Sequence, residues 1–276
     1  MNLILENNQK QKWEKVMKTA LITGASFGIG YEFAKIFANE KYDLVLVARN
    51  RERLNEIESE LKRNNNIRIK TLVKDLAQPS SPQEIFDELK YDKIEIDVLI
   101  NNAGFGLLGP FTELSLKDQI DMIQVNITSL VHLTGLLLPS MIARGSGKIM
   151  NVASTAAFQP GPNMAVYYAT KSFVLSFSNA LHQELKDKNI TVTALCPGPT
   201  KTEFQKRARM ENINLERSKL LPYMSAEKVA LAGYKGLMKG KRIVIPGILN
   251  KLGTKIVKVF PESFVLAVIH KFNSRN

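Results

Sequence analysis

The stretch KTALITGASFGIGYEFAKIFANE, residues 18–40, decides the start of the fold. Its first part, KTALIT (18–23), has the apolar run of a buried strand, and YEFAKIFANE (31–40) has the spacing of a helix. Between them lies TGASFGIG (23–30), whose glycines permit a tight turn and a close approach of the backbone to a ligand. A glycine-rich turn that follows a strand and opens a helix can hold a pyrophosphate at the helix N-terminus. A structural turn without a ligand is the alternative.

The same alternation of apolar runs and amphipathic stretches continues along the chain. Further strands are predicted at 43–48, 67–73, 96–102, 147–154, 190–196 and 242–246, and helices at 51–64, 81–90, 115–144 and 163–187. The strand runs are nearly continuous in Val, Ile and Leu, which is typical of strands buried on both faces of a parallel sheet. We therefore expect an α/β fold: one doubly wound, Rossmann-type domain with a parallel seven-stranded sheet flanked by helices.

The predicted domain spans residues 17–247, and the chain shows neither a linker nor an internal repeat within it. Residues 1–16 are expected to be a flexible extension, and residues 248–276 a basic amphipathic extension of two short helices separated by Pro261. Residues 201–224 are charged and irregular, as lids and specificity loops often are. The lone cysteine, Cys196, cannot form an internal disulfide, which suits a reducing compartment.

The sequence suggests a soluble protein, because we find no apolar run long enough to span a bilayer and no secretory signal. A cytoplasmic location is therefore expected. The net charge of +12 is uneven: residues 1–200 hold 22 Lys and Arg against 21 acids, and residues 201–276 hold 16 against 5. A basic end can meet anionic lipid, nucleic acid or an anionic substrate, or can be a solvated surface. No aromatic-basic nucleic-acid motif is present, but weak membrane-surface contact of the C-terminal helices is an open alternative.

The stretch AVYYATKSFVLSF (165–177) places two tyrosines before a lysine. Tyr167 is four residues before Lys171 and Tyr168 is three before it, so either can share a helix face with the lysine. At about 100° per residue, Tyr167 lies about 40° and Tyr168 about 60° from Lys171 around the helix axis. Helix geometry therefore prefers Tyr167 only slightly.

Together these motifs resemble the short-chain dehydrogenase/reductase family over about residues 17–247. The spacing of TGASFGIG follows the family's T-G-x-x-x-G-x-G, and Asn101-Asn102-Ala103-Gly104 resembles its N-N-A-G segment. Asn126 matches the family's helix asparagine, and Ser154 ends a strand thirteen residues before a Y-x-x-x-K made by Tyr167 and Lys171. The resemblance selects Tyr167 over Tyr168, which is then expected to pack against a neighbouring helix or a subunit.

The resemblance implies an oxidoreductase that transfers a hydride between a nicotinamide and a carbonyl or secondary alcohol, usually as a homodimer or homotetramer. It implies that Tyr167 is the general acid/base, that Ser154 polarises the carbonyl, and that Lys171 holds the nicotinamide ribose. Asn126 is expected to order a water that connects Lys171 to solvent. The implied cofactor-binding residues are Gly24, Ser26, Phe27, Gly28, Ile29, Gly30, Arg49, Asp75, Leu76, Asn102, Ala103, Gly104, Tyr167, Lys171, Pro197, Gly198, Thr200 and Thr202.

Arg49 favours NADP(H) over NAD. It ends the second strand, nineteen residues after Gly30, where an acidic residue would bind the ribose 2′-hydroxyl of NAD. An arginine can instead pair with a 2′-phosphate. By resemblance Asp75 faces the adenine, although it could also be a simple cap at a helix start.

A hydrophobic ketone or aldehyde is the expected substrate, because the expected pocket lining is mostly apolar: Phe105, Leu107, Leu108, Ala156 and Phe158. Basic lid residues Lys206, Arg207 and Arg209 could instead meet an anionic carrier. A lysine close to Tyr167 would lower the pKa of the phenol. Two other functions remain open: a nucleotide-binding regulatory protein without catalysis, and a basic membrane-associated protein. No metal site is expected.

Overall fold

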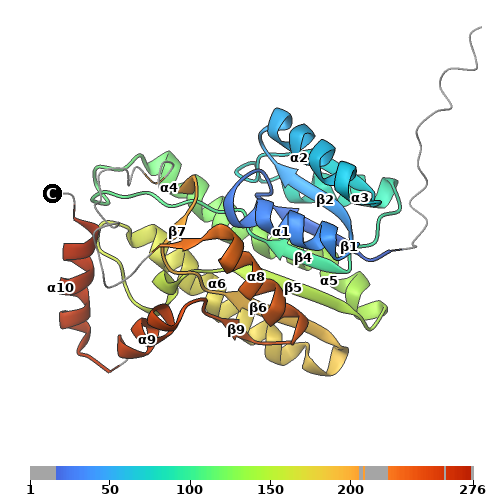
Figure 1. Cartoon of the computed structure of the whole chain (residues 1–276). Helices are drawn as coiled ribbons and strands as arrows, with labels where there is room; N and C mark the ends of the chain where they lie inside the picture. The colour runs from blue at the N-terminus through green and yellow to red at the C-terminus, as the bar shows by residue number, and fades with distance from the viewer. Residues whose placement is uncertain (1–16, 205–207, 209–222, 258, 275–276) are drawn as a thin grey trace, which may run out of the picture.

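The computed structural model describes residues 17–204, 208, 223–257 and 259–274 (Figure 1). The predicted extension 1–16 and the lid residues Lys206, Arg207 and Arg209 lie outside the described residues. A parallel sheet of seven strands, ordered β3-β2-β1-β4-β5-β6-β9, forms the centre of the fold. Its strands are β1 Thr19–Thr23, β2 Asp43–Ala48, β3 Ile69–Val73, β4 Val98–Asn101, β5 Gly147–Val152, β6 Ile190–Leu195 and β9 Ile243–Val244. The predicted fold class is confirmed.

Helices cover both faces of the sheet, which is why most positions of its strands are apolar. One layer contains α1 Gly28–Asn39, α2 Arg51–Asn64 and α8 Ala226–Met238, packed on the sheet through residues such as Phe33, Leu54 and Val229. The other contains α3 Ser81–Tyr91, α5 Ser129–Ala143 and α6 Ala165–Glu184, packed through residues such as Ile85 and Leu137. Every residue of β1 and of β2 is buried, as expected between two helical layers.

The strand order places the functional segments together. β1 pairs with β2 on one side and with β4 on the other, so the chain winds outward in both directions from the β1–β4 pair. Ligands of open α/β sheets bind beyond the carboxyl ends of the strands at this switch point. The glycine turn follows β1, Asn102 follows β4, and Ser154 lies just after β5, all at that edge.

The long helix predicted at 115–144 is observed as three consecutive parts: α4 Leu116–Ile123, a π-helical turn η1 Gln124–Thr128, and α5. The π-helical turn carries Asn126 and was not predicted. The run Leu116–Ala143 is also long and apolar enough to cross a membrane, by length and composition alone, and 39% of its apolar stretch is buried. The expectation that no such run exists is therefore wrong, although the buried side chains of α5 pack against the sheet, as in the core of a soluble α/β protein.

The C-terminal part turns back over the same edge of the sheet. β7 Thr200–Lys201 pairs in parallel with β8 Met224–Ser225, so the two ends of the predicted irregular segment are held together. Two short helices, α9 Ile248–Ile256 and α10 Glu262–Asn273, follow β9, and Pro261 is the N-cap of α10. In Figure 1, α10 stands beside the end of the molecule that carries β7 and α4, far from α2 and α3.

Candidate active site

The glycine turn is a structure that side chains would not permit. Gly24 and Gly28 have φ angles of +64° and +57°, a region that favours glycine. A Cβ at Gly24 would lie 2.9 Å from the Cα of Ala103, and one at Gly30 would lie 2.2 Å from the carbonyl oxygen of Gly24. Gly30 therefore allows helix α1 to pack on the turn. It does not line the cavity described below, and its contact with a pyrophosphate stays a prediction.

Asn102 fixes the glycine turn to the end of β4. Its Nδ2 donates to the carbonyl oxygens of Thr23 and Gly24, at 3.0 and 3.2 Å. The hydroxyl of Thr23 accepts from the backbone N–H groups of Asn102 and Ala103, both at 3.0 Å. These four hydrogen bonds hold the turn rigid, so the side chain of Asn102 supports the binding loop.

A cavity of about 930 Å³ runs along this edge of the sheet. Eighteen of the predicted cofactor and catalytic residues line it: Gly24, Ser26, Phe27, Gly28, Ile29, Arg49, Asp75, Leu76, Asn102, Ala103, Gly104, Ser154, Tyr167, Lys171, Pro197, Gly198, Thr200 and Thr202. Asn126 and Gly30 do not line it. The structure thus brings together residues that are more than 170 positions apart in the sequence.

The residues at one end of the cavity fit the diphosphate of a dinucleotide. The N-cap residue of α1, Phe27, has extended backbone and offers no side-chain hydrogen bond to the helix. The first N–H groups of α1 therefore remain available to an anion, with the positive end of the helix dipole behind them. Thr202 closes this end from the other side, because a Cβ on Gly28 would lie 2.8 Å from its methyl group.

Arg49 lies farther along the same cavity, after β2. Its guanidinium is exposed and lies 3.9 Å from a carboxylate oxygen of Asp75, a loose ion pair. Exposed pairs of this kind contribute about 0–1 kcal/mol, so the guanidinium can turn toward another anion at little cost. Arg53 is held more firmly, because it donates to the carbonyl oxygen of Ser26 and to Glu56. Asp75 also accepts a bond from the N–H of Ala77, so it caps its own turn while facing the cavity.

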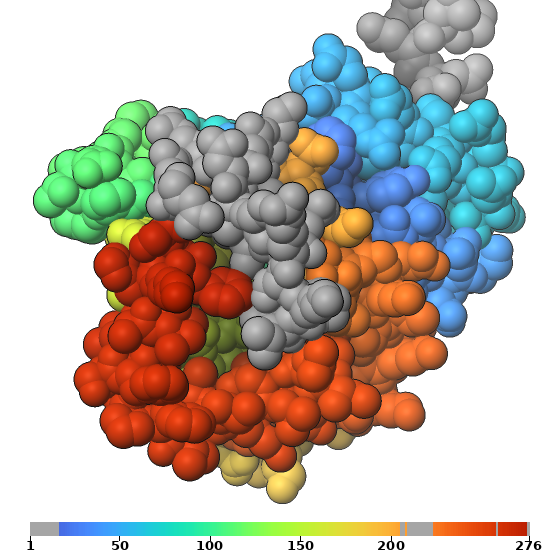
Figure 2. Space-filling view, turned by 60° about the vertical axis from the view of Figure 1, so that its left-hand side comes forward, coloured from blue at the N-terminus to red at the C-terminus, as the bar shows by residue number. Residues whose placement is uncertain are grey.

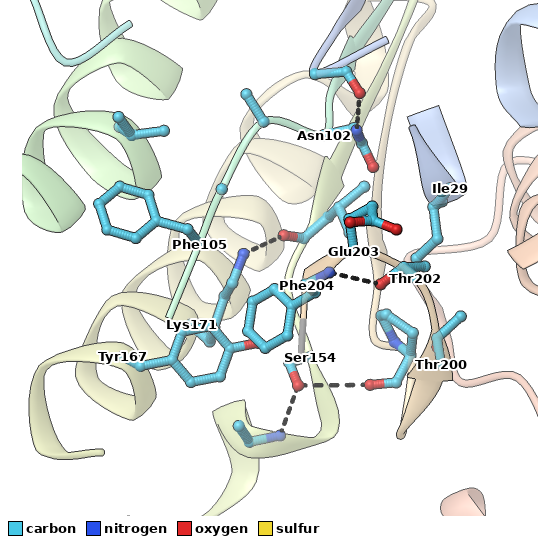
Figure 3. Close-up of a pocket in the computed structure, with 18 of the residues that line it drawn as sticks. Ile29, Asn102, Phe105, Ser154, Tyr167, Lys171, Thr200, Thr202, Glu203 and Phe204 are labelled. Carbon is cyan, nitrogen blue, oxygen red and sulfur yellow. Dashed lines mark hydrogen bonds between the residues drawn. The ribbon is translucent and has the colours of Figure 1, made fainter. Parts of the chain in front are cut away.

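The hydroxyl of Ser154 has two kinds of contact in the structure. Its Oγ accepts from the N–H of Ala156 at 3.1 Å and so caps the short helix η2 Thr155–Phe158. The same hydroxyl donates to the carbonyl oxygen of Pro197 at 3.4 Å and forms a hydrogen bond with Tyr167. Ser154 is therefore both a cap and part of the tyrosine site, as Figure 3 shows.

Tyr167 lies in an aromatic part of the cavity. Its ring lies beside that of Phe204, with the centroids 5.4 Å apart (Figure 3). The ring centroid of Tyr168 is 6.0 Å away. Gly106 makes room for this arrangement, since a Cβ there would lie 2.9 Å from Phe204 and 3.0 Å from the Tyr167 ring. Burial raises the pKa of Tyr167 above its ordinary value, and the hydrogen bond with Ser154 acts in the opposite direction. The phenol is therefore protonated at neutral pH.

Lys171 is buried on the same side of the cavity. Its Nζ donates to the carbonyl oxygen of Val152 at 2.9 Å and lies 5.8 Å from the centroid of the Tyr167 ring. Burial lowers the pKa of Lys171 to about 8. We expected the lysine to lower the pKa of Tyr167. Instead, burial has the largest effect on the pKa of both groups, because it disfavours the charged form of each. Gly104 leaves space for the ammonium, since a Cβ there would lie 3.3 Å from Nζ.

Asn126 lies behind the site and positions one wall of it. Its Nδ2 donates to the carbonyl oxygen of Phe105 and to the hydroxyl of Thr170, both at 3.0 Å, and its Oδ1 accepts from the N–H of Phe105 at 3.1 Å. The side chain thus binds the segment after β4 and also α6, which carries Tyr167 and Lys171. The π-helical turn around Asn126 is a feature that often marks functional sites. The ordered water expected beside Asn126 stays a prediction.

The apolar end of the cavity differs partly from the prediction. Phe105, Leu107 and Ala156 line it, whereas Leu108 is buried in the core and Phe158 lines a neighbouring pocket. The sequence reasoning missed one wall, which is made by residues of α10: Val268, Ile269, Phe272 and Asn273. Their apolar spacing was visible in the sequence, but the surface on which the helix packs depends on the tertiary fold.

Tyr168 contacts this C-terminal wall. Asn273 is buried and donates from Nδ2 to the carbonyl oxygen of Pro162 at 2.9 Å and to the hydroxyl of Tyr168 at 3.5 Å. Asn163 donates in turn to the carbonyl oxygen of Asn273 at 3.4 Å. The helix that Tyr168 was expected to meet is therefore α10 of the same chain.

Comparison with known proteins agrees with the geometry of the site. The family described as "short chain dehydrogenase" matches residues 18–213. Sulfoacetaldehyde reductase 2 of Chromohalobacter salexigens is 38% identical over 186 residues, 67% of this chain and 73% of that one. The human very-long-chain 3-oxoacyl-CoA reductase is 33% identical over 193 residues, which cover 68% of this chain but only 61% of the relative.

Solved structures show the same fold. A short-chain dehydrogenase from Sphingobium yanoikuyae in complex with NADPH has a TM-score of 0.78 at 31% identity, covering 89% of this chain and 96% of that one. A bulky-bulky ketone specific alcohol dehydrogenase from Comamonas testosteroni has a TM-score of 0.73 at 29% identity, with coverage of 90% and 96%. The chain belongs to the short-chain dehydrogenase/reductase family and is an oxidoreductase of alcohol or carbonyl groups that uses a nicotinamide nucleotide.

Proposed function

We propose that the protein uses NADP(H) to interconvert a hydrophobic ketone or aldehyde and its alcohol, with Tyr167 as the general acid/base. The observation that carries this proposal is the joint position of Ser154, Tyr167 and Lys171 on the wall of the cavity that the glycine turn also lines. When bound, the nicotinamide supplies or accepts the hydride at the carbonyl carbon. The remaining task of the protein is to move one proton at the carbonyl oxygen.

Tyr167 supplies that proton in the direction of reduction. Burial raises the pKa of the phenol, so the proton is present at neutral pH. The hydroxyl of Ser154, which is hydrogen-bonded to Tyr167, can donate to the same substrate oxygen as negative charge develops there. The ammonium of Lys171 then stabilises the phenolate that remains, because opposite charges in a poorly hydrated site interact strongly. In the oxidation of an alcohol the proton returns to Tyr167.

Arg49 supports the preference for NADP(H). Arg49 lines the cavity after β2, and among the residues that the structure describes its guanidinium has the loose contact with Asp75 as its one ion pair. A 2′-phosphate at this end of the cavity would form charge-assisted hydrogen bonds with it. The fold alone does not favour either cofactor, since a Burkholderia phymatum structure of this fold, 22% identical with a TM-score of 0.77 over 88% of this chain and 93% of its own, is described in complex with NAD.

The apolar lining by Phe105, Leu107 and the inner side of α10 supports a hydrophobic substrate. Assembly as a homodimer or homotetramer in the cytoplasm also remains our proposal. Ile142 of α5 and Phe173 of α6 are exposed apolar side chains that a subunit contact would cover.

The decisive experiment is a screen of ketones and aldehydes in which turnover is measured as the loss of NADPH or NADH absorbance. We expect turnover of apolar carbonyl compounds with NADPH in preference to NADH. Binding of NADPH without turnover of any compound would favour the regulatory alternative instead.

A further inference from the structure

Helix α9 has its polar and apolar sides in the opposite places from those of an ordinary surface helix. Asn250 and Thr254 are 6% and 5% exposed, and Asn250 donates to the carbonyl oxygen of Pro246 at 2.8 Å. In contrast, Ile248, Leu252 and Ile256 are 80%, 50% and 52% exposed. At about 100° per residue these three lie within about 80° of the helix circumference, opposite the buried pair. A helix that buries its amide and hydroxyl and exposes its aliphatic side chains is expected where something apolar covers it.

The apolar surface continues across the turn into α10. The rings of Phe260 and Phe264 are stacked with their centroids 5.3 Å apart, and both are about half exposed. We use the term α9–α10 apolar face for the eight exposed side chains Ile248, Leu249, Leu252, Ile256, Val259, Phe260, Phe264 and Val268. In Figure 2 the red atoms of the two helices form one continuous region of the surface.

We propose that the α9–α10 apolar face binds the surface of a membrane that contains anionic lipid. Lys251 and Lys255 are exposed beside the apolar stripe of α9, and Lys271 is exposed at the C-terminal end of the stripe on α10. Residues 248–276 contain five Lys and Arg and a single acid, Glu262. Apolar side chains bordered by lysines are the composition of helices that lie in the interface of an anionic bilayer.

The same charges argue against a second copy of this chain as the occupant. A two-fold contact joins two identical faces, so both surfaces brought together would carry the same excess of lysine. Like charges brought together at an interface oppose association. Anionic headgroups would instead neutralise Lys251, Lys255 and Lys271.

The position of α10 connects the α9–α10 apolar face with the cavity. This connection extends the proposal to the substrate, and that part rests on the proposed function. Val268 belongs to the α9–α10 apolar face and also lines the cavity, and Ile269 and Phe272 line it from the next positions of the helix. The cavity wall and the docking surface are therefore two sides of one helix. We infer that the substrate is a long-chain ketone or aldehyde that partitions into lipid and enters beside α10.

The test is co-sedimentation of the purified full-length chain with phosphatidylcholine vesicles, with and without about one third phosphatidylserine. We expect binding to the anionic vesicles, and at least a tenfold weaker partition for the double variant Leu252→Gln with Phe264→Gln. Neither residue lines the cavity. The matched control is Leu231→Gln, which changes a side chain that is 41% exposed on α8 and should bind as the wild type does. Lys251→Gln with Lys255→Gln should weaken binding only to the anionic vesicles.

The proposal is overturned if the wild type does not bind anionic vesicles, or if the Leu231 variant loses as much binding as the double variant. It is also overturned if the double variant dissociates an oligomer in sedimentation velocity while vesicles have no effect. None of these measurements uses turnover, so they stand whether or not the carbonyl chemistry is found. Where turnover is found, the double variant should raise the KM of a vesicle-bound long-chain ketone and leave that of a short, water-soluble ketone unchanged.

Discussion

Lys171→Met should abolish turnover and yet change the stability of the chain in a direction that depends on pH. Burial lowers the pKa of Lys171 from 10.5 to about 8. Each pKa unit corresponds to about 1.4 kcal/mol, so the buried ammonium costs about 3 kcal/mol of folding free energy at pH 7. Methionine removes that cost but also removes the hydrogen bond to the carbonyl oxygen of Val152, worth about 1–3 kcal/mol. The variant should therefore be more stable than the wild type by about 0–2 kcal/mol at pH 7.

The pH dependence separates these two contributions. The folded pKa of Lys171 lies below its unfolded value, so the folded chain releases the proton while the unfolded chain still holds it. The cost of the ammonium is thus complete below about pH 8 and is relieved as the pH rises toward 10.5, which stabilises the wild type over that interval. Methionine carries no such proton. The advantage of the variant should decrease by about 2 kcal/mol between pH 7 and about pH 9.5.

Urea unfolding followed by circular dichroism at the two pH values measures this difference for the wild type and the variant. Lys188→Met is the matched control, because Lys188 is exposed just after the same helix. Its effect should stay within about 0.5 kcal/mol at both pH values. A stability difference for Lys171→Met that does not change with pH would refute the reasoning that the ammonium is buried and costly.

Tyr167→Phe should lower kcat by at least about 100-fold, the contribution of a general acid, while NADPH binding measured by fluorescence is retained. Tyr168→Phe should keep substantial activity, and the opposite order would assign the proton donor to Tyr168. Arg49→Asp should raise the KM for NADPH by about 10–100-fold, from loss of a charge-assisted contact of about 1.5–3 kcal/mol, and that for NADH far less. Equal changes in the two KM values would show that Arg49 does not bind the 2′-phosphate. Asn126→Ala loses the bonds to Phe105 and should lower the unfolding free energy in urea by about 2–4 kcal/mol; an unchanged value would contradict its bracing role.

The sequence was sufficient for the parts of the fold that local pattern determines. Mostly apolar runs located the seven strands of the large sheet, since a strand covered on both faces is apolar at most positions. The ends moved by one or two residues, as for β3, which begins at Ile69 although its apolar run begins at Ile67. Helix α1 begins at Gly28, three residues before the expected start at Tyr31, so the last two glycines of the motif lie in its first turn.

The parts that the sequence did not show depend on contacts that form only in the folded chain. The missing side chain of Gly30 makes room for the carbonyl oxygen of Gly24, which its place in the motif did not reveal. The effect of Lys171 on Tyr167 was judged from their spacing, which contains no information on how deeply both groups are buried. The spacing also left Tyr167 and Tyr168 nearly equal, and only the family resemblance separated them. Both tyrosines line the cavity, and the hydroxyl of Tyr168 accepts a hydrogen bond from Asn273.

The residues predicted from the sequence bear mainly on the proposed reaction, whereas the missed residues of α10 bear on which substrate fits the cavity. The match to the family description ends at residue 213, so it includes Ser154, Tyr167 and Lys171 but not α10. Val268, Ile269 and Phe272, which wall the apolar end of the cavity, come from outside that match. Transfer of a proton requires the same few groups for any carbonyl compound, whereas recognition of a particular compound depends on the shape of the wall around it. Variation in the C-terminal helix can therefore change the substrate while the chemistry stays constant, and α10 is the element on which a search for the substrate should concentrate.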